Sequence, residues 1–185
     1  MKILKTFILT TLFSLNLYGA KMENIKNAYF AGGCFWGVEY YFEKVNGVLK
    51  ADSGYMGGQL NNPSYREVCN GNTGHLEVVE VRYDSKVVSF ESLARLFLEI
   101  HDPTQTNGQG PDIGSQYLSA IFYSNENEKQ ISQKLLDILT NKGYKIATKL
   151  ISTKNTPFFR AEEYHQDYYF KHNKIPYCHS YVKRF

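Results

Sequence analysis

Hydrophobic and polar residues along the chain form short runs of two kinds, one typical of strands and one typical of helices. The clearest strand is predicted over residues 75–83, where the side chains divide into two alternating faces. Further short apolar runs, bounded by turn-forming residues, predict strands over residues 27–31, 48–55, 117–123 and 146–151.

Apolar residues at helical spacing predict helices over residues 34–44, 90–100, 124–142 and, in a shorter piece, 161–168. Ser89 and Ser124 stand where a side chain would cap the second and third helices by accepting a hydrogen bond from the first turn. Asn46-Gly47 and Gly143 mark the ends of the first and third helices, because glycine is common just after a helix.

The order of these elements mixes strands and helices without regular strand-helix-strand crossovers. It predicts an α+β fold in one domain, a two-layer sandwich in which helices pack on a mixed, mostly antiparallel sheet. The polar loop over residues 102–116 is longer than most, and such loops are usually functional or disordered. After Ser152 the chain has little apolar periodicity, so we expect a long, coil-rich C-terminal segment.

Residues 1–20 have the pattern of a signal peptide. Lys2 and Lys5 precede an apolar run over residues 7–18, and Gly19-Ala20 supply small residues for cleavage. The run is too short for an ordinary transmembrane helix, and the alternatives are an uncleaved anchor or a helix buried in the fold. We therefore expect export, to the periplasm, and a mature domain over residues 21–185.

Composition narrows the classes of partner. The 185-residue chain is 43% hydrophobic, which suffices for the core of one soluble domain. Its net charge of +3 comes from scattered residues without a basic stripe, so we expect no nucleic-acid partner. We expect a monomer without membrane association once the leader is removed. The histidines are spread out and no Cys-x-x-Cys pair is present, so no metal site is predicted.

Three cysteines, Cys34, Cys69 and Cys178, leave at least one thiol outside any disulfide. Cys34 stands at a predicted helix start, where free backbone N–H groups and the helix dipole favour a thiolate. The neighbouring Phe35 and Trp36 offer an apolar wall beside its sulfur. A buried core thiol with aromatic packing is the alternative, but the preceding glycines and the distal Cys178 favour a reactive nucleophile.

Glu77 and Cys178 each allow two interpretations from the residues alone. Strand alternation places Glu77 on an apolar face, where burial would raise its pKa and make it a proton donor, whereas at the strand end it would lie in water. Cys178 can condense with a sulfenic acid on Cys34, or form a structural disulfide with Cys34 or Cys69. Cys69 has no reactive context and is interpreted as structural.

Six motifs resemble the methionine sulfoxide reductase A family, whose members act on the S epimer of the sulfoxide. The resemblance extends from about Ala28 to Val182. In chain order the motifs are residues 33–37 (GCFWG), 54–58 (GYMGG), 68–77 (VCNGNTGHLE), 101–104 (HDPT), 112–117 (DIGSQY) and 161–166 (AEEYHQ). Six motifs in one order make the resemblance highly specific.

The resemblance implies a catalytic domain that reduces methionine S-sulfoxide, free or in proteins, in the repair of oxidised proteins. By this resemblance Cys34 attacks the sulfoxide sulfur and becomes a sulfenic acid. Glu77 would supply a proton to the oxygen, helped by Tyr55 and Tyr117. Cys178 matches a resolving cysteine, so the implied cycle passes through a Cys34–Cys178 disulfide that a thioredoxin-like partner reduces.

The resemblance also implies how substrate is held. Phe35 and Trp36 would cradle the methyl group, Asp112 would help hold the substrate backbone, and His165 would shape the pocket wall. The family uses no metal or organic cofactor, so none is expected here.

Some residues depart from the family pattern. Leu118, Gly108 and Pro111 replace residues that are more often arginine, arginine and asparagine, which is expected to alter loop conformation and substrate preference. The chain lacks the further tail cysteine of some members, so a second resolving step is not expected. The competing interpretations are a cysteine peroxidase, a cysteine hydrolase of the Cys-His-Asn type, and a non-enzymatic exported protein with a structural Cys34–Cys178 disulfide.

Overall fold

One mixed sheet organises the molecule, whose computed structural model describes residues 24–185. Its strands are β1 (Ile25–Ala31), β2 (Val48–Met56), β3 (Leu76–Asp84), β6 (Ala120–Tyr123), β7 (Lys149–Ser152) and β8 (Phe159–Arg160). They lie in the order β7-β6-β1-β3-β2-β8, and every neighbouring pair is antiparallel except β6 and β7. The predicted α+β class is confirmed. The predicted leader lies outside the described residues.

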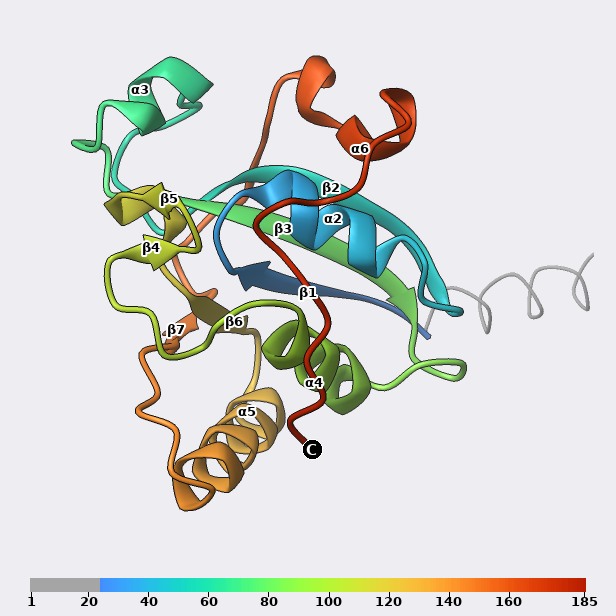
Figure 1. Cartoon of the computed structure of the whole chain (residues 1–185). Helices are drawn as coiled ribbons and strands as arrows, with labels where there is room; N and C mark the ends of the chain where they lie inside the picture. The colour runs from blue at the N-terminus through green and yellow to red at the C-terminus, as the bar shows by residue number, and fades with distance from the viewer. Residues whose placement is uncertain (1–23) are drawn as a thin grey trace, which may run out of the picture.

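Some helices pack against this sheet, and others lie beyond its edges (Figure 1). They are α2 (Phe35–Phe42), α3 (Tyr65–Cys69), α4 (Phe90–Ile100), α5 (Glu126–Asn141) and α6 (Tyr168–Lys171), with single 3-10 turns at Ser115–Tyr117 and Glu163–His165. The prediction for Ser89 is confirmed, because its hydroxyl accepts from the Ser92 N–H at 3.1 Å. The prediction for Ser124 is wrong: Asn125 caps α5, and its side chain accepts from the Glu128 N–H at 2.9 Å.

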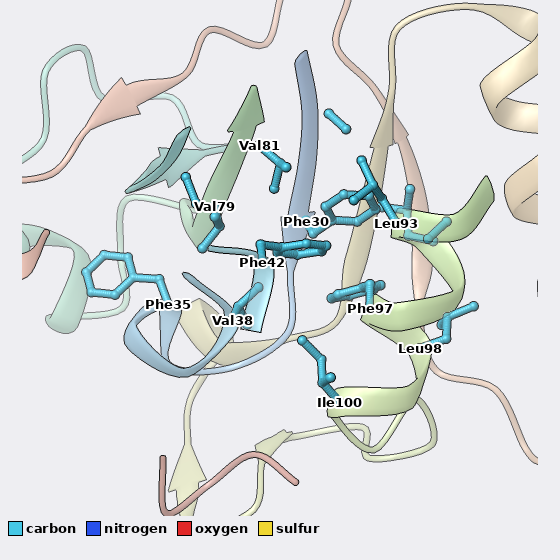
Figure 2. Close-up of a cluster of buried hydrophobic side chains, with 14 of the residues drawn as sticks. Phe30, Phe35, Val38, Phe42, Val79, Val81, Leu93, Phe97, Leu98 and Ile100 are labelled. Carbon is cyan, nitrogen blue, oxygen red and sulfur yellow. The ribbon is translucent and has the colours of Figure 1, made fainter. Parts of the chain in front are cut away.

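The main core lies between the sheet and helices α2 and α4 (Figure 2). The face of β3 that carries Glu77, Val79, Val81 and Tyr83 is buried, including Glu77, for which the residues alone had left burial open. The ring of Phe30 on β1 stacks on Phe42 of α2 at 5.0 Å and on a ring of α4 at 5.1 Å between centroids. This packing fixes the C-terminal end of α2 against the middle of the sheet.

The long loop over residues 102–116 is ordered rather than structureless. It contains a small hairpin of β4 (Gly108–Gln109) and β5 (Asp112–Ile113). Gly108, one of the departures from the family pattern, has φ +155°, and a Cβ there would collide with the Asp112 carbonyl oxygen. Glycine therefore permits the close approach of the two short strands at this position.

Most predicted elements differ from the structure by one or two residues at an end, and three differ by more. The strand predicted over residues 117–123 begins at Ala120, because Ser115–Tyr117 forms a 3-10 turn. The strand predicted over residues 146–151 is β7, which begins only at Lys149. The helix predicted over residues 161–168 is wrong. The chain leaves the 3-10 turn at Gln166, whose side-chain amide donates to the backbone carbonyls of Ser53 and Ala161, each at 3.0 Å.

The C-terminal segment crosses the molecule in coil, as predicted, but it is anchored. In Figure 1 it passes in front of α2 and ends beside α4. The Val182 N–H donates to the Glu99 carbonyl oxygen at 2.7 Å, and the Arg184 N–H donates to the Glu99 side chain at 2.8 Å. None of the helices that the structure describes is both long and apolar enough to cross a membrane.

A buried carboxyl group on α2, that of Glu39, is expected to make stability depend on pH. Glu39 accepts from the Ser53 N–H at 3.2 Å, and burial raises its pKa to about 8. This pKa exceeds the ordinary value of 4.5, so the unfolded chain ionises first and stability falls as pH rises from about 4.5 to about 8. Glu39→Gln should therefore raise the melting temperature at pH 8 by a few degrees, with little change at pH 4.

Thermal unfolding between pH 4 and pH 8 measures this effect. Glu43, whose pKa burial also raises to about 8, should retain part of the pH dependence in the variant. Glu126→Gln on the exposed face of α5 is the control, because its side chain is 66% exposed. An equal loss of stability with rising pH in wild type and Glu39→Gln would contradict the prediction.

Candidate active site

Cys34 is the N-cap residue of α2, as its place after two glycines predicted. It is buried, with 8% of its surface exposed, so a small opening to solvent persists. The predicted thiolate is wrong for this arrangement: the hydrogen bond with the Cys178 side chain, and then burial, raise the Cys34 pKa well above its ordinary value. The Trp36 backbone N–H lowers the pKa, as expected at a helix start, but by less.

Glu77 lies next to this thiol on the buried face of β3. Its Oε2 accepts from the Phe35 N–H at 3.0 Å, and its Oε1 has no hydrogen-bond partner among residues 24–185. Burial, and then the charge of Cys34, raise the Glu77 pKa well above its ordinary value. Of the two interpretations of Glu77, the buried carboxyl group is therefore correct. The raised pKa favours the protonated form of this group, and its Oε1 is free to act on a bound substrate.

Aromatic rings surround the first turn of α2. Trp36 stacks on Tyr168 at 3.6 Å between centroids, and its Nε1–H donates to Nδ1 of His165 at 3.0 Å. His165 is buried and lies 5.0 Å from the Phe35 ring. Burial lowers the His165 pKa, so the ring is neutral with its proton on Nε2. Phe35, Trp36 and His165 thus form one aromatic cluster beside Cys34.

The two tyrosines lie in different surroundings. Tyr55 is fully buried, its ring is 5.8 Å from Phe35, and its hydroxyl donates to Oε2 of Glu162 at 2.9 Å. Burial and this hydrogen bond raise the Tyr55 pKa. Tyr117 is half-buried, and its pKa is raised by burial and then by the nearby charge of Glu77. Both phenols keep their protons at neutral pH and can donate hydrogen bonds.

Asp112 lies in β5, on the hairpin of the long loop. Its carboxylate accepts from the Tyr177 hydroxyl at 3.1 Å, so the tail contacts the residue implied to hold the substrate backbone. The Asp112 charge also raises the pKa values of Cys34 and Glu77, which indicates that it lies near both.

The tail brings Cys178 to Cys34. Cys178 is buried and hydrogen bonds with Cys34, and all three cysteines are free thiols. Its Sγ lies 3.1 Å from Nδ1 of His179, and Nε2 of His179 lies 2.6 Å from the Gly32 carbonyl oxygen. Cys69, by contrast, is exposed at the end of α3.

Sequence reasoning missed two residues of this site. Glu162 joins three segments, because its carboxylate accepts from the Tyr55 hydroxyl and from the Tyr65 N–H, each at 2.9 Å. Its place in the AEEYHQ motif was the available signal. His179 was missed because the sequence indicated no histidine partner for Cys34, yet it directly follows Cys178. No group of three or more His, Cys, Asp or Glu residues within 24–185 could hold a metal ion.

Comparison with known proteins agrees with these features. The family model described as peptide methionine sulfoxide reductase matches residues 26–185. A peptide methionine sulfoxide reductase MsrA of Sulfolobus acidocaldarius is 45% identical over 148 residues, which cover 80% of this chain and 83% of that protein. The structure of Mxr1 from Saccharomyces cerevisiae in reduced form is similar with a TM-score of 0.77 and 35% identity, covering 87% and 94% of the two chains.

A second structure, of Mxr1 from the same yeast in complex with Trx2, is similar with a TM-score of 0.57 and 25% identity. This match covers 87% of this chain and 92% of that chain. The family model spans nearly all the described residues, and the Sulfolobus protein is similar over four-fifths of the chain. The chain therefore belongs to the peptide methionine sulfoxide reductase family.

Proposed function

We propose that the protein reduces the S epimer of methionine sulfoxide at Cys34 and resolves the product with Cys178. Family membership makes it a methionine sulfoxide reductase. The observation that carries the residue assignment is one buried cluster in which Cys34 has a protonated carboxyl group, Glu77, beside it and a second thiol, Cys178, in hydrogen-bond contact. Such a cluster contains a nucleophile, a proton donor and a resolving thiol.

In the first step the sulfur of Cys34 attacks the sulfoxide sulfur while Glu77 protonates the sulfoxide oxygen. The oxygen and one proton end on Cys34 as a sulfenic acid, and methionine leaves. The proton that the Cys34 thiol gives up restores Glu77, so atoms and charge balance. Tyr117 can donate a hydrogen bond to the same oxygen, and Tyr55 can do so once its hydroxyl turns away from Oε2 of Glu162. The free Oε1 of Glu77 supports the role of this carboxyl group as proton donor.

Substrate binding is assigned to the aromatic cluster and Asp112. Phe35 and Trp36 hold the methyl group, and His165 keeps Trp36 in place through its 3.0 Å hydrogen bond. Asp112 binds the substrate backbone through acceptor positions of its carboxylate that the Tyr177 hydroxyl, at 3.1 Å, leaves free.

In the second step Cys178 displaces the hydroxyl of the sulfenic acid, and water and a Cys34–Cys178 disulfide form. A thioredoxin-like protein then reduces this disulfide. The complex of the similar yeast protein Mxr1 with Trx2 supports such a partner. A cavity of about 430 Å³ borders Cys178 on this chain, which offers an approach to its sulfur.

Export is the part of the proposal that depends on the N-terminal sequence. Lys2, Lys5 and the apolar run that follows support a signal peptide and a periplasmic location. An oxidising compartment requires a dedicated electron supply for the reductant. We propose that the mature protein works there as a monomer.

Cys178→Ser is expected to limit the enzyme to about one methionine per chain with the S sulfoxide. Sulfenic acid still forms on Cys34, but the serine hydroxyl cannot condense with it. Methionine released per chain, measured with a thioredoxin-like reductant present, checks this result. Mass spectrometry after trapping with a sulfenic-acid reagent should find the label on Cys34.

The R sulfoxide and hydrogen peroxide are the control substrates. We expect no methionine from the R epimer. If the protein were a cysteine peroxidase, it would turn over peroxide without needing the aromatic rings beside Cys34. Trp36→Ala would then leave peroxide turnover unchanged, whereas a sulfoxide reductase should lose sulfoxide turnover in this variant. Many thioredoxin-driven turnovers in Cys178→Ser would contradict the role given to Cys178.

A further inference from the structure

His179 has a fixed place between the two reacting segments. It is buried, with 5% of its surface exposed. Its two ring nitrogens have different partners: Nε2 lies 2.6 Å from the Gly32 carbonyl oxygen, and Nδ1 lies 3.1 Å from Sγ of Cys178. The ring therefore connects the backbone just before Cys34 to the thiol that resolves it.

These contacts fix the tautomer of the ring. A carbonyl oxygen can only accept a hydrogen bond, so Nε2 carries a proton and donates it to Gly32. In the neutral imidazole the other nitrogen, Nδ1, then has a free lone pair. The Cys178 thiol donates its proton towards that lone pair. Burial keeps the ring neutral, because it lowers the His179 pKa to about 4.

Gly37, in the motif around Cys34, makes room for this ring. A Cβ on Gly37 would collide with Nδ1 of His179 and would lie 2.8 Å from its Cγ. A Cβ on Gly33 would lie 3.7 Å from the ring, an ordinary contact, and would collide instead with the Gln109 side chain. The sequence of the helix start thus accommodates the ring as well as Cys34.

We propose that His179 is the general base of the resolving step, a role that rests on the proposed function of Cys178. Nδ1 takes the thiol proton as the Cys178 sulfur attacks the sulfur of the Cys34 sulfenic acid. The S–S bond forms with the electron pair of Cys178, the S–O bond breaks, and its electron pair leaves with the hydroxide. The proton held on His179 passes to that hydroxide, so water leaves and the ring returns to its neutral form.

Of the titratable groups around Cys178, His179 is the one placed to accept the thiol proton. Cys178 contacts its Nδ1, Asp112 raises its pKa, and the positive charge of His179 would lower the pKa of His101, which is itself buried and neutral. His101 hydrogen bonds instead with the Phe97 carbonyl oxygen and the Ser119 hydroxyl, at 2.6 and 2.7 Å. Among these groups His179 alone has a free lone pair directed at the resolving sulfur.

The test compares the two chemical steps in a single turnover of the full chain. Reduced protein is mixed with one equivalent of methionine S-sulfoxide, and methionine release and disulfide formation are followed separately in time. His179→Asn retains an oxygen acceptor near the position of Nδ1 but cannot take up a proton. We expect it to lower the disulfide rate constant about 10²-fold relative to the methionine rate constant at pH 7. Sulfenic acid should accumulate and be trapped.

The pH dependence distinguishes a base from a structural residue. In wild type the disulfide rate constant should be level between pH 6 and pH 8, because His179 is neutral throughout. In His179→Asn it should rise with pH, up to tenfold per unit, since solvent hydroxide must then take the proton. His179→Gln, which can still donate to the Gly32 carbonyl, should behave alike and serves as a second variant if His179→Asn folds poorly.

His172→Asn is the matched control, because this histidine is exposed in the same C-terminal segment. Its ratio of the two rate constants should equal that of wild type. A wild-type ratio and a level pH profile in both His179 variants would overturn the proposal. If Cys178→Ser forms no stable sulfenic acid, the role of Cys178 fails. If it does, and the His179 variants resolve at the wild-type rate, the role of His179 alone fails.

Discussion

Cys34→Ser is expected to abolish reduction of methionine S-sulfoxide, with kcat/KM lowered by at least roughly 10⁴-fold. A serine hydroxyl would have to form an oxygen–oxygen bond to accept the sulfoxide oxygen, which gives no product comparable to a sulfenic acid. The fold should survive, because serine is a favoured N-cap residue and Cys34 is the N-cap of α2. Methionine formation from the S sulfoxide, with a thioredoxin-like reductant, is the measurement.

Cys69→Ser provides the matched control for this variant. It makes the same chemical change at an exposed thiol at the end of α3. The activity of Cys69→Ser should lie within about twofold of wild type. The melting temperatures of Cys69→Ser and Cys34→Ser should lie within a few degrees of the wild-type value. Activity above about 1% of wild type in Cys34→Ser would contradict the role of Cys34 as the nucleophile. A large loss in Cys69→Ser would show that the structural interpretation of that residue is wrong.

Local periodicity was sufficient to predict the elements that build the core. The alternation of β3 and the helical spacing of α4 are long, and the face that each predicts is buried, so pattern and structure agree there. On β3 the opposite face is also buried at Leu76 and Val78. The short elements could not be predicted in this way. β8 has only two residues, and its pairing with β2 depends on a long-range contact. α3 has five residues, although its capping box of Ser64 and Glu67 was a readable signal.

The site was predictable only as far as chemistry is local. The position of Cys34 at a helix start followed from its neighbours, but its raised pKa comes first from Cys178, at the far end of the chain. The burial of Glu77 was one of two open interpretations until the strand was seen inside the fold. Asp112 and His165 were implied by resemblance alone, and His179 was not identified at all. Long-range packing sets the protonation states in this site, and sequence patterns do not report it.

Glu77→Gln is expected to lower the rate of methionine release about 10²- to 10⁴-fold at pH 7, the range for loss of a general acid. The amide has nearly the same shape, and its oxygen can still accept from the Phe35 N–H, which Glu77 binds at 3.0 Å. It cannot give up a proton to the sulfoxide oxygen. The wild-type rate should fall as pH rises through the raised Glu77 pKa, because the protonated carboxyl is the active form. The variant should lack this fall.

Stability separates the catalytic role from a structural one. The folded-state pKa of Glu77 is raised, so this residue removes stability as pH rises above the ordinary value of 4.5. The neutral amide has no such penalty, and Glu77→Gln should melt at least as high as wild type at pH 8. Glu80→Gln, at a half-buried position on the opposite face of β3, is the control and should retain activity. If Glu77→Gln is stable and active, the proton reaches the sulfoxide oxygen from another group. If Glu77→Gln is stable and inactive, Glu77 is the acid that supplies the proton beside Cys34.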